Sequence, residues 1–148
     1  MKKIIFGLLV LLLTVSITNI HAQNDAGYEA NEHGVAALNS GDYDRAISLF
    51  NEAIKLAPNN PFGYYNRGSA YFNMSDFDRA IMDFTQVIRM DANFIDAYYS
   101  RGYCYMYKLQ FARAITDFEA VLLLDPYYLD IRESLSLARA MQAMGQKK

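Results

Sequence analysis

The 148-residue chain contains no tryptophan, three prolines, two histidines and a single cysteine, Cys104. One cysteine forms no intramolecular disulfide and builds no cysteine-rich zinc site, and so few histidines disfavour most catalytic and metal chemistry. Fourteen Lys and Arg stand against sixteen Asp and Glu. The chain therefore lacks the basic excess that neutralises phosphates, and we expect no nucleic-acid partner. Hydrophobic residues make up 53% of the sequence, which indicates a folded domain rather than a disordered tail.

Long apolar runs are also scarce, and the only one lies at the N-terminus. Two lysines precede an uncharged apolar stretch at 4–13, polar residues dilute its far end, and Ala22 places a small residue before Gln23. This order is typical of a secretory signal peptide, here residues 1–22. An uncleaved anchor is the alternative, but a spanning helix needs about 20 apolar residues, roughly twice this run. We expect an exported protein, periplasmic or secreted, with no membrane insertion after cleavage.

The rest of the chain repeats itself with one fixed period, the step from Gly34 to Gly68 and again to Gly102. Six columns keep this spacing, and each column holds one residue type or one chemical class. The columns are Gly34, Gly68 and Gly102; Tyr43, Phe77 and Phe111; Ala46, Ala80 and Ala114; Ile47, Ile81 and Ile115; Phe50, Phe84 and Phe118; and Ile54, Ile88 and Leu122. Such self-similarity predicts an array of three units.

Each unit has the pattern of two helices. Apolar residues recur at three- and four-residue steps on both sides of a polar break, as expected for two helical faces. Side-chain oxygens at helix starts accept orphan backbone N–H groups, and proline is tolerated in the first turn. The expected helix starts are Asp44, Asp78, Asn60 before Pro61, and Asp125 before Pro126.

The glycine column predicts close helix packing within each unit. A glycine inside a helix costs about 1 kcal/mol relative to alanine. Keeping it three times implies that a neighbouring helix, through the alanine column, approaches too closely for a Cβ. We expect the phenylalanine column at Phe50, Phe84 and Phe118 to fill the space between successive units.

The second unit reads Tyr64-x2-Arg67-Gly68-x2-Tyr71, and the third unit repeats this pattern. With the alanine and phenylalanine columns, the chain resembles a tetratricopeptide repeat array, whose signature is W-x2-L-G-x2-Y, then A-x3-F, then P. The first unit departs most from it. The resemblance covers residues 27 to about 144.

The resemblance implies an all-α fold, a right-handed superhelical solenoid of three antiparallel helix pairs plus a capping helix. The expected units are residues 27–60, 61–94 and 95–128, followed by a capping helix at 129–146. In that last segment, Ile131, Leu135, Ala138 and Met141 lie on one apolar stripe, as expected for a helix that covers the final unit.

One charged pair recurs in two of the units. Arg67 accompanies Asp83, and Arg101 accompanies Asp117, whereas the first unit loses both charges at once. Each pair lies equally far on either side of its helical turn, so the two residues can face each other in a helix hairpin. A charged contact surface is one interpretation, and a salt bridge within the unit is the one that we favour.

No arrangement of residues predicts catalysis. His33 is the only histidine after the signal segment, and its unit has no cysteine. Cys104 lies between two tyrosines and is interpreted as a packed small hydrophobe rather than a reactive thiol. No phosphate-binding glycine loop or metal-ligand spacing occurs. We expect a non-enzyme with no cofactor and no bound metal.

Twelve tyrosines favour binding instead, because tyrosine gives a large contact area with a polar tip. In the family that the chain resembles, the first helices of the units line a concave groove that holds peptides. The expected partner-binding residues are Tyr28, Asn31, Val35, Phe62, Tyr65, Asn66, Ser69, Tyr99, Tyr103 and Tyr107. The alternative is that some of these rings pack between helices.

Some family members grip the C-terminal carboxylate of a chaperone tail with lysine, asparagine and arginine. These places correspond to Asn31, Val35, Asn66, Asp96 and Ser100. Only Asn66 matches, and Asp96 reverses a charge, so we do not expect chaperone tails to bind.

The leading hypothesis is therefore an exported adaptor that holds a peptide or helix of a protein partner. Self-association as a structural component, giving a homo-oligomer, is the first alternative. A small-ligand or glycan binder is the second, although such platforms usually use the tryptophan that is absent here.

Overall fold

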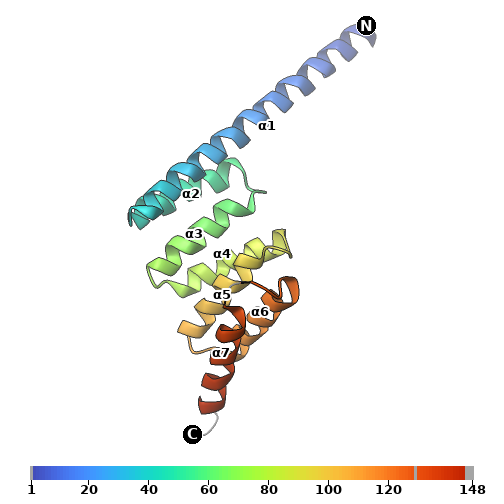
Figure 1. The fold of residues 1–148 in the computed structure, drawn as a ribbon. Coiled ribbons are helices and arrows are strands. Elements are labelled where there is room, and N and C mark those ends of the chain that lie inside the picture. The colour runs from blue at the N-terminus through green and yellow to red at the C-terminus, as the bar shows by residue number, and fades with distance from the viewer. Residues whose placement is uncertain (1, 129, 146–148) are drawn as a thin grey trace.

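The computed structural model describes the backbone of residues 2–128 and 130–145, and the side chains of residues 18, 20–128 and 130–145. This part of the chain is all-helical (Figure 1). The helices are α1 (Lys2–Asn39), α2 (Tyr43–Leu56), α3 (Pro61–Asn73), α4 (Phe77–Met90), α5 (Ile95–Tyr107), α6 (Phe111–Leu124) and α7 (Ile131–Gly145).

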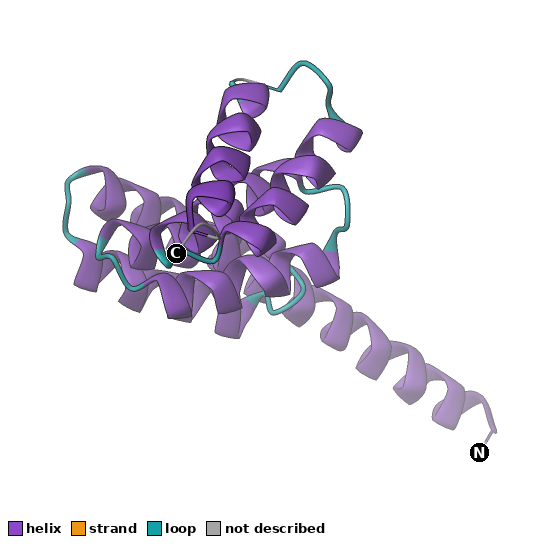
Figure 2. Cartoon of the chain, turned by 90° about the horizontal axis from the view of Figure 1, so that it is seen from below, coloured by secondary structure: helices purple, strands orange, loops and turns teal. Residues whose placement is uncertain are grey.

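The helices stack in the order of the sequence. α1 packs on α2, α3 on α4 and α5 on α6, and each pair then packs on the next. Figure 2 shows the pairs side by side, with the N-terminal part of α1 extending beyond the stack. The three antiparallel helix pairs and the additional C-terminal helix confirm the predicted solenoid.

Side-chain caps begin the second helices of the first two units, two residues before the expected starts at Asp44 and Asp78. Asp42 and Asp76 accept hydrogen bonds from the backbone N–H of Arg45 and Arg79, respectively. The predicted caps lie inside the first turn, where a carboxylate still favours the positive end of the helix dipole. In the third unit Gln110 occupies the cap position and its side chain accepts no capping hydrogen bond.

The proline-containing junctions differ from each other. Asn60 caps α3 by accepting from the N–H of Phe62, with Pro61 in the first turn, as predicted. Asp125 was expected to begin a helix, but it ends α6 and accepts from the N–H of Tyr127. The capping helix begins only at Ile131.

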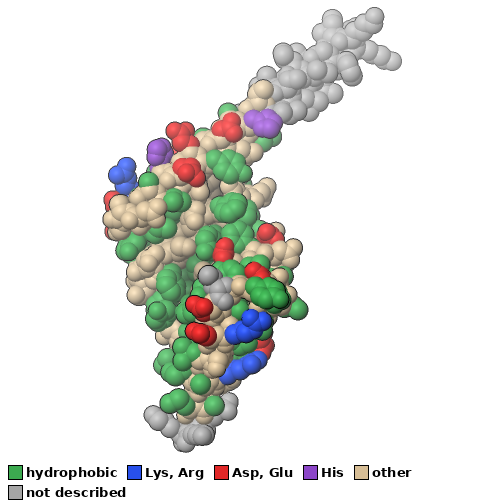
Figure 3. All heavy atoms as spheres, viewed as in Figure 1, with side chains coloured by type: hydrophobic (Ala, Val, Ile, Leu, Met, Phe, Trp, Pro, Cys, Tyr) green, Lys and Arg blue, Asp and Glu red, His purple; other side chains and the backbone are tan. Residues whose placement is uncertain are grey.

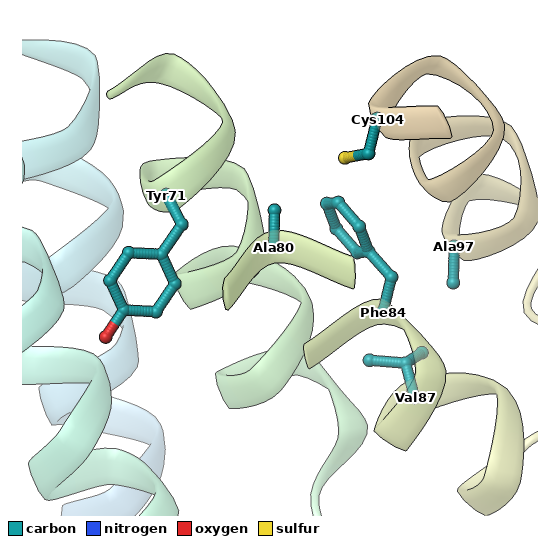
Figure 4. Close-up of a cluster of buried hydrophobic side chains, with 6 residues drawn as sticks. All are labelled: Tyr71, Ala80, Phe84, Val87, Ala97 and Cys104. Atoms are coloured by element: carbon teal, nitrogen blue, oxygen red, sulfur yellow. The ribbon is translucent and has the colours of Figure 1, made fainter. Parts of the chain in front are cut away.

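The glycine column lies directly against the phenylalanine column. A Cβ on Gly34, Gly68 or Gly102 would come within 2.5, 2.9 or 2.6 Å of the phenylalanine ring of the same unit. Each ring is also packed by the following unit. Figure 4 shows this for Phe84, which lies between Val87 of its own helix and both Ala97 and Cys104 of α5. The rings therefore fill both the unit and the joint between units.

The recurrent Arg–Asp pairs are ion pairs within their units, as favoured from the sequence. Nε and Nη2 of Arg101 donate to the two carboxylate oxygens of Asp117 at 2.9 and 2.7 Å. Arg67 and Asp83 repeat this bidentate geometry. The Asp117 side chain is only 4% exposed. Arg101 also donates to Thr85 of the preceding unit, so this arginine links two neighbouring units.

The first helix is longer than its repeat unit. α1 continues through the expected cleavage point without a break in the helix, and residues 20–25 are exposed. Burial begins at Gly27, where the helix meets Leu56 and Ala57. Side chains up to residue 17, which include most of the expected signal, lie outside the described ones. Within the described residues, no helix has the length and apolar character to cross a membrane.

The last helix covers the third unit. Ile131, Leu135 and Ala138 are buried against α6 and its phenylalanine, as the apolar stripe predicted. Arg139 on the adjoining face donates to Glu119 of α6 at 2.8 Å. α7 therefore takes the place that the first helix of a further unit would occupy.

Candidate partner-binding groove

Polar contacts join the first helices of successive units. Asn66 donates to the side-chain oxygen of Asn31 at 3.0 Å. One unit later, the hydroxyl of Tyr65 is hydrogen-bonded with Ser100. At the last joint, Tyr103 and Ser134 share a 2.7 Å hydrogen bond. These contacts fix the spacing of α1, α3, α5 and α7 and define one continuous face.

Between α3 and α5 this face is hollowed into a pocket of about 160 Å³. We refer to this pocket and the surrounding surface of α3 and α5 as the groove. The pocket is lined by Ser69, Phe72, Asn73, Phe84, Tyr99, Ser100 and Tyr103. Its walls are aromatic rings and its polar groups are hydroxyls and one amide. An engineered cavity of about 150 Å³ accommodates benzene, so the pocket has room for one apolar side chain.

Of the predicted partner-binding residues on α1 and α3, some have exposed side chains and others already make contacts within the protein. Tyr28 and Phe62 are 56% and 51% exposed, and both line a second pocket of about 470 Å³ between α1 and the α2–α3 connection. Asn31 is only 8% exposed, and its hydrogen bond to Asn66 uses both amides. Tyr65 packs its ring on Phe84 and Phe94, with ring centroids 5.6 and 5.1 Å apart.

Tyr99 and Tyr103 line the pocket, but α7 and its leading segment also contact them. The ring of Tyr99 packs on Tyr103 and on Tyr128, with centroids 4.9 and 5.1 Å apart. The Tyr128 hydroxyl donates to Asp96, and that of Tyr103 bonds Ser134. Burial raises the pKa of Tyr99 to about 12, and its hydrogen bond with Tyr103 adds to this effect. The Tyr99 phenol is therefore neutral at physiological pH.

Tyr107 lies away from the pocket. Its ring stacks on Phe77 at 5.0 Å with an interplanar angle of 2°, and it meets the edge of Phe72. It remains 61% exposed, at the end of the helix pairs where the hairpin turns lie. Val35, the other predicted position on α1, is half-buried beside the core of the first unit.

Four pocket residues were not among the predicted partner contacts, and one of them, Phe84, was predicted only as a packing residue. Phe72 and Asn73 close the pocket at the end of α3, and Ser100 lies between the rings of α5. The repeat would have located Asn73, because it stands one period before Tyr107. Ser100 likewise stands one period after Asn66.

The single cysteine and the possible metal ligands can be located in the structure. Cys104 is fully buried, and burial raises the pKa of its thiol to about 12. It is therefore packed and protonated, as predicted. Among the described residues, no group of histidine, cysteine and carboxylate side chains could hold a metal ion.

The face of the molecule in Figure 3 mixes hydrophobic and acidic side chains. Hydrophobic side chains run from α1 towards α7, with Asp and Glu among them, while Lys and Arg appear only near the end of the α1–α2 pair and beside α7. At the places where chaperone-tail binders carry cations, the chain has neutral side chains and Asp96, which already accepts from Tyr128.

Comparisons with known proteins agree with this architecture. Profiles described as tetratricopeptide repeat match residues 61–94 and 95–128, and one described as TPR repeat matches 36–75. Hsp70-Hsp90 organizing protein 3 of Arabidopsis thaliana is 50% identical over 42 residues, which are 28% of this chain and 8% of that protein. The match thus spans a small fraction of that relative's length.

Solved domains resemble nearly the whole array. The first TPR domain of Spaghetti (RPAP3), bound to the HSP90 peptide SRMEEVD, is 27% identical with a TM-score of 0.79, over 81% of this chain and 95% of that one. The TPR2B domain of yeast Sti1, in a complex with pHsp70, is 26% identical with a TM-score of 0.74, over 78% and 97%. From its period, its helix pairs and these matches, the chain belongs to the tetratricopeptide repeat family.

Proposed function

We propose that the chain is a non-enzymatic adaptor that holds a peptide or helix of a protein partner in the groove. One observation carries this proposal: the pocket between α3 and α5, lined by rings and hydroxyls and large enough for an apolar side chain. The similar Spaghetti and Sti1 domains are recorded with a bound HSP90 peptide and with pHsp70, and this supports a protein–protein interaction module.

Site-specific photo-crosslinking tests the proposal. A photoreactive amino acid replaces Asn73, an exposed residue of the pocket wall, in the full-length chain. The control carries it at Met82, which is 71% exposed on α4. We expect one partner to be crosslinked in an extract of the producing organism through position 73 and not through position 82. Equal yields at both positions, or none at 73, would contradict the proposal.

We further propose that the protein is exported and that residues 1–22 are removed. Residues 20–25 are exposed, and the packed part of α1 begins at Gly27. Cleavage after Ala22 would therefore leave the core of the first unit intact. Terminal sequencing of the protein recovered outside the cytoplasm should give Gln23 as its first residue. An intact N-terminus in that fraction would contradict this proposal.

A strip on α7 supports self-association as a second candidate function. Leu137, Met141 and Met144 are three or four residues apart and therefore lie on one side of the helix. Leu137 and Met144 are 55% and 67% exposed. Light scattering should then give a mass that rises with concentration, and Leu137→Glu with Met144→Glu should abolish the rise. A constant monomer mass would exclude this candidate.

A further inference from the structure

In the described parts of the first helices of the units, every Lys and Arg is held in an ion pair. In α1 from residue 18, in α3 and in α5, the only such residues are Arg67 and Arg101. Both are half-buried and pair with Asp83 and Asp117 of the second helices, on the side away from the pocket. His21 and His33 are the remaining basic groups, both on α1, and His33 lies 3.8 Å from Glu29.

Carboxylates, in contrast, lie beside the rings of the groove. Asp96 is exposed at the start of α5, accepts from Tyr128, and acts electrostatically on Tyr65. Asp130 is exposed just before α7 and acts electrostatically on Tyr99. Asp96 therefore lies near Tyr65 of α3, Asp130 lies near Tyr99 of the pocket wall, and among the described residues neither carboxylate forms an ion pair with Lys or Arg.

The basic residues of α7 point elsewhere. Arg132 and Arg139 are seven residues apart, which places them on the same side of the helix. That side is fixed by the ion pair of Arg139 with Glu119 of α6. The groove end between α5 and α7 is thus aromatic and acidic.

Asp96 and the pocket are separated by a defined distance along α5. Asp96 precedes the pocket residues Tyr99, Ser100 and Tyr103 by about one and a third turns of α5, or roughly 7 Å along the helix axis. In an extended peptide two residues span about 7 Å and project to the same side. In a helical segment four or five residues span the same distance.

We propose that the occupant of the groove is a cationic, apolar segment of a protein. An apolar side chain enters the pocket between α3 and α5, and a neighbouring Lys or Arg pairs with Asp96, with Asp130 as a second acceptor. The basic residue stands two positions from the apolar one in an extended segment, or four to five in a helical one. This inference rests on the proposed adaptor function and specifies its ligand.

The same charges select against acidic segments. A like charge placed beside Asp96 and Asp130 is repelled, which at these exposed carboxylates costs about as much as the matching attraction gains, up to about fivefold in affinity or about 1 kcal/mol. Specificity would therefore come from repulsion of acidic tails as well as from attraction of basic ones.

A random library of 12-residue peptides displayed on phage tests the inference on the full-length chain. Peptides retained by the wild type are counter-selected on Ser69→Leu, in which the added side chain fills the pocket; circular dichroism checks that this variant is folded. Peptides lost on Ser69→Leu are sequenced and the best is synthesised. Its affinity is measured for Asp96→Asn and Asp130→Asn. Glu52→Gln is the control, an exposed carboxylate on α2.

We expect Lys and Arg to be enriched at the stated spacing from an apolar residue. Each groove substitution should weaken binding up to about fivefold, the value of an exposed charge pair, and Glu52→Gln should leave it unchanged. Replacing the peptide's basic residue by Gln should remove the effect of Asp96→Asn. Pocket-dependent peptides without this charge preference would overturn the inference and keep the adaptor function. If no selected peptide depends on the pocket, both fail.

Discussion

The buried Arg101–Asp117 pair gives a quantitative prediction about stability. The two side chains are 16% and 4% exposed and make two short, parallel hydrogen bonds. Removing one partner leaves the other charge buried without compensation, which costs about 3–5 kcal/mol. Asp117→Leu alone and Arg101→Met alone should therefore each be strongly destabilising.

The double variant should be far more stable than the sum of the single ones predicts. Replacing both members of a buried ion pair by hydrophobic residues is often neutral or stabilising, and the lost hydrogen bond to Thr85 is worth about 1 kcal/mol. We expect a double variant within about 1–2 kcal/mol of the wild type. The first unit supports this, since it has His33 and Leu49 at the same positions.

Thermal unfolding followed by far-UV circular dichroism measures the effect. One kcal/mol corresponds to about 2–4 °C in Tm for a chain near this size, so each single variant should melt roughly 10 °C lower. Glu119→Gln is the control, because its ion pair with Arg139 is exposed and is worth at most about 1 kcal/mol. Strictly additive losses in the double variant would refute the reasoning.

Four further predictions follow from features described above. Gln110→Asp gives α6 the aspartate cap of the two preceding units, and it should stabilise the protein by about 1 kcal/mol in urea unfolding; no change would mean that the cap is already satisfied. Gly102→Ala places a Cβ 2.6 Å from a ring carbon and should cost about 1–2 kcal/mol after the gain in helix propensity, whereas Gly145→Ala, which meets nothing within 4 Å, should cost nothing. Cys104 should resist an aromatic disulfide reagent at pH 8 until denaturant is added, because burial raises its pKa to about 12; rapid labelling of the folded protein would contradict its burial. The peptide SRMEEVD should show no binding in isothermal titration calorimetry, because the groove offers carboxylates where a tail carboxylate needs cations; a measurable affinity would refute that argument.

The sequence predicts those features that depend on the period of the repeat. The glycine column indicates a close contact that recurs in every unit, and the structure has it, although the residue that meets each glycine is the phenylalanine of the same unit and not the predicted alanine. The pairing of Arg67 with Asp83 was likewise the favoured interpretation, because two charges equidistant from a turn can face each other within their own hairpin. Periodic packing is local, so it can be derived without knowing the ends of the array.

Features at the ends of the array could not be predicted in the same way. The contact of Tyr99 with Tyr128 does repeat, because Tyr65 packs on Phe94 one period earlier. The hydrogen bond of Tyr103 with Ser134 depends instead on α7, which lies beyond the third unit, and Ser69 stands in place of Tyr103 one period earlier. The stack of Tyr107 on Phe77 is a contact between α5 and α4 of the preceding unit. Periodicity specifies which side of a helix a residue occupies, but the neighbour that covers it depends on the junction.

The caps show a similar limit at finer scale. α2 and α4 each begin with two aspartates two residues apart, Asp42 and Asp44 or Asp76 and Asp78. Either aspartate could have been the cap. The choice falls on Asp42 and Asp76 because the chain leaves the preceding turn there with non-helical backbone angles. The backbone angles of Asp42 and Asp76 cannot be predicted from composition and spacing alone.

The joints between units suggest how such an array can change its length. Each first helix meets the preceding pair through the same columns, and α7 meets the third pair in the place of a first helix. A copy of residues 61–94 inserted after residue 94 would therefore pack on surfaces like those that residues 61–94 already contact. Duplication in steps of one whole unit could extend the array, and add a further pocket to it, without redesigning either terminus.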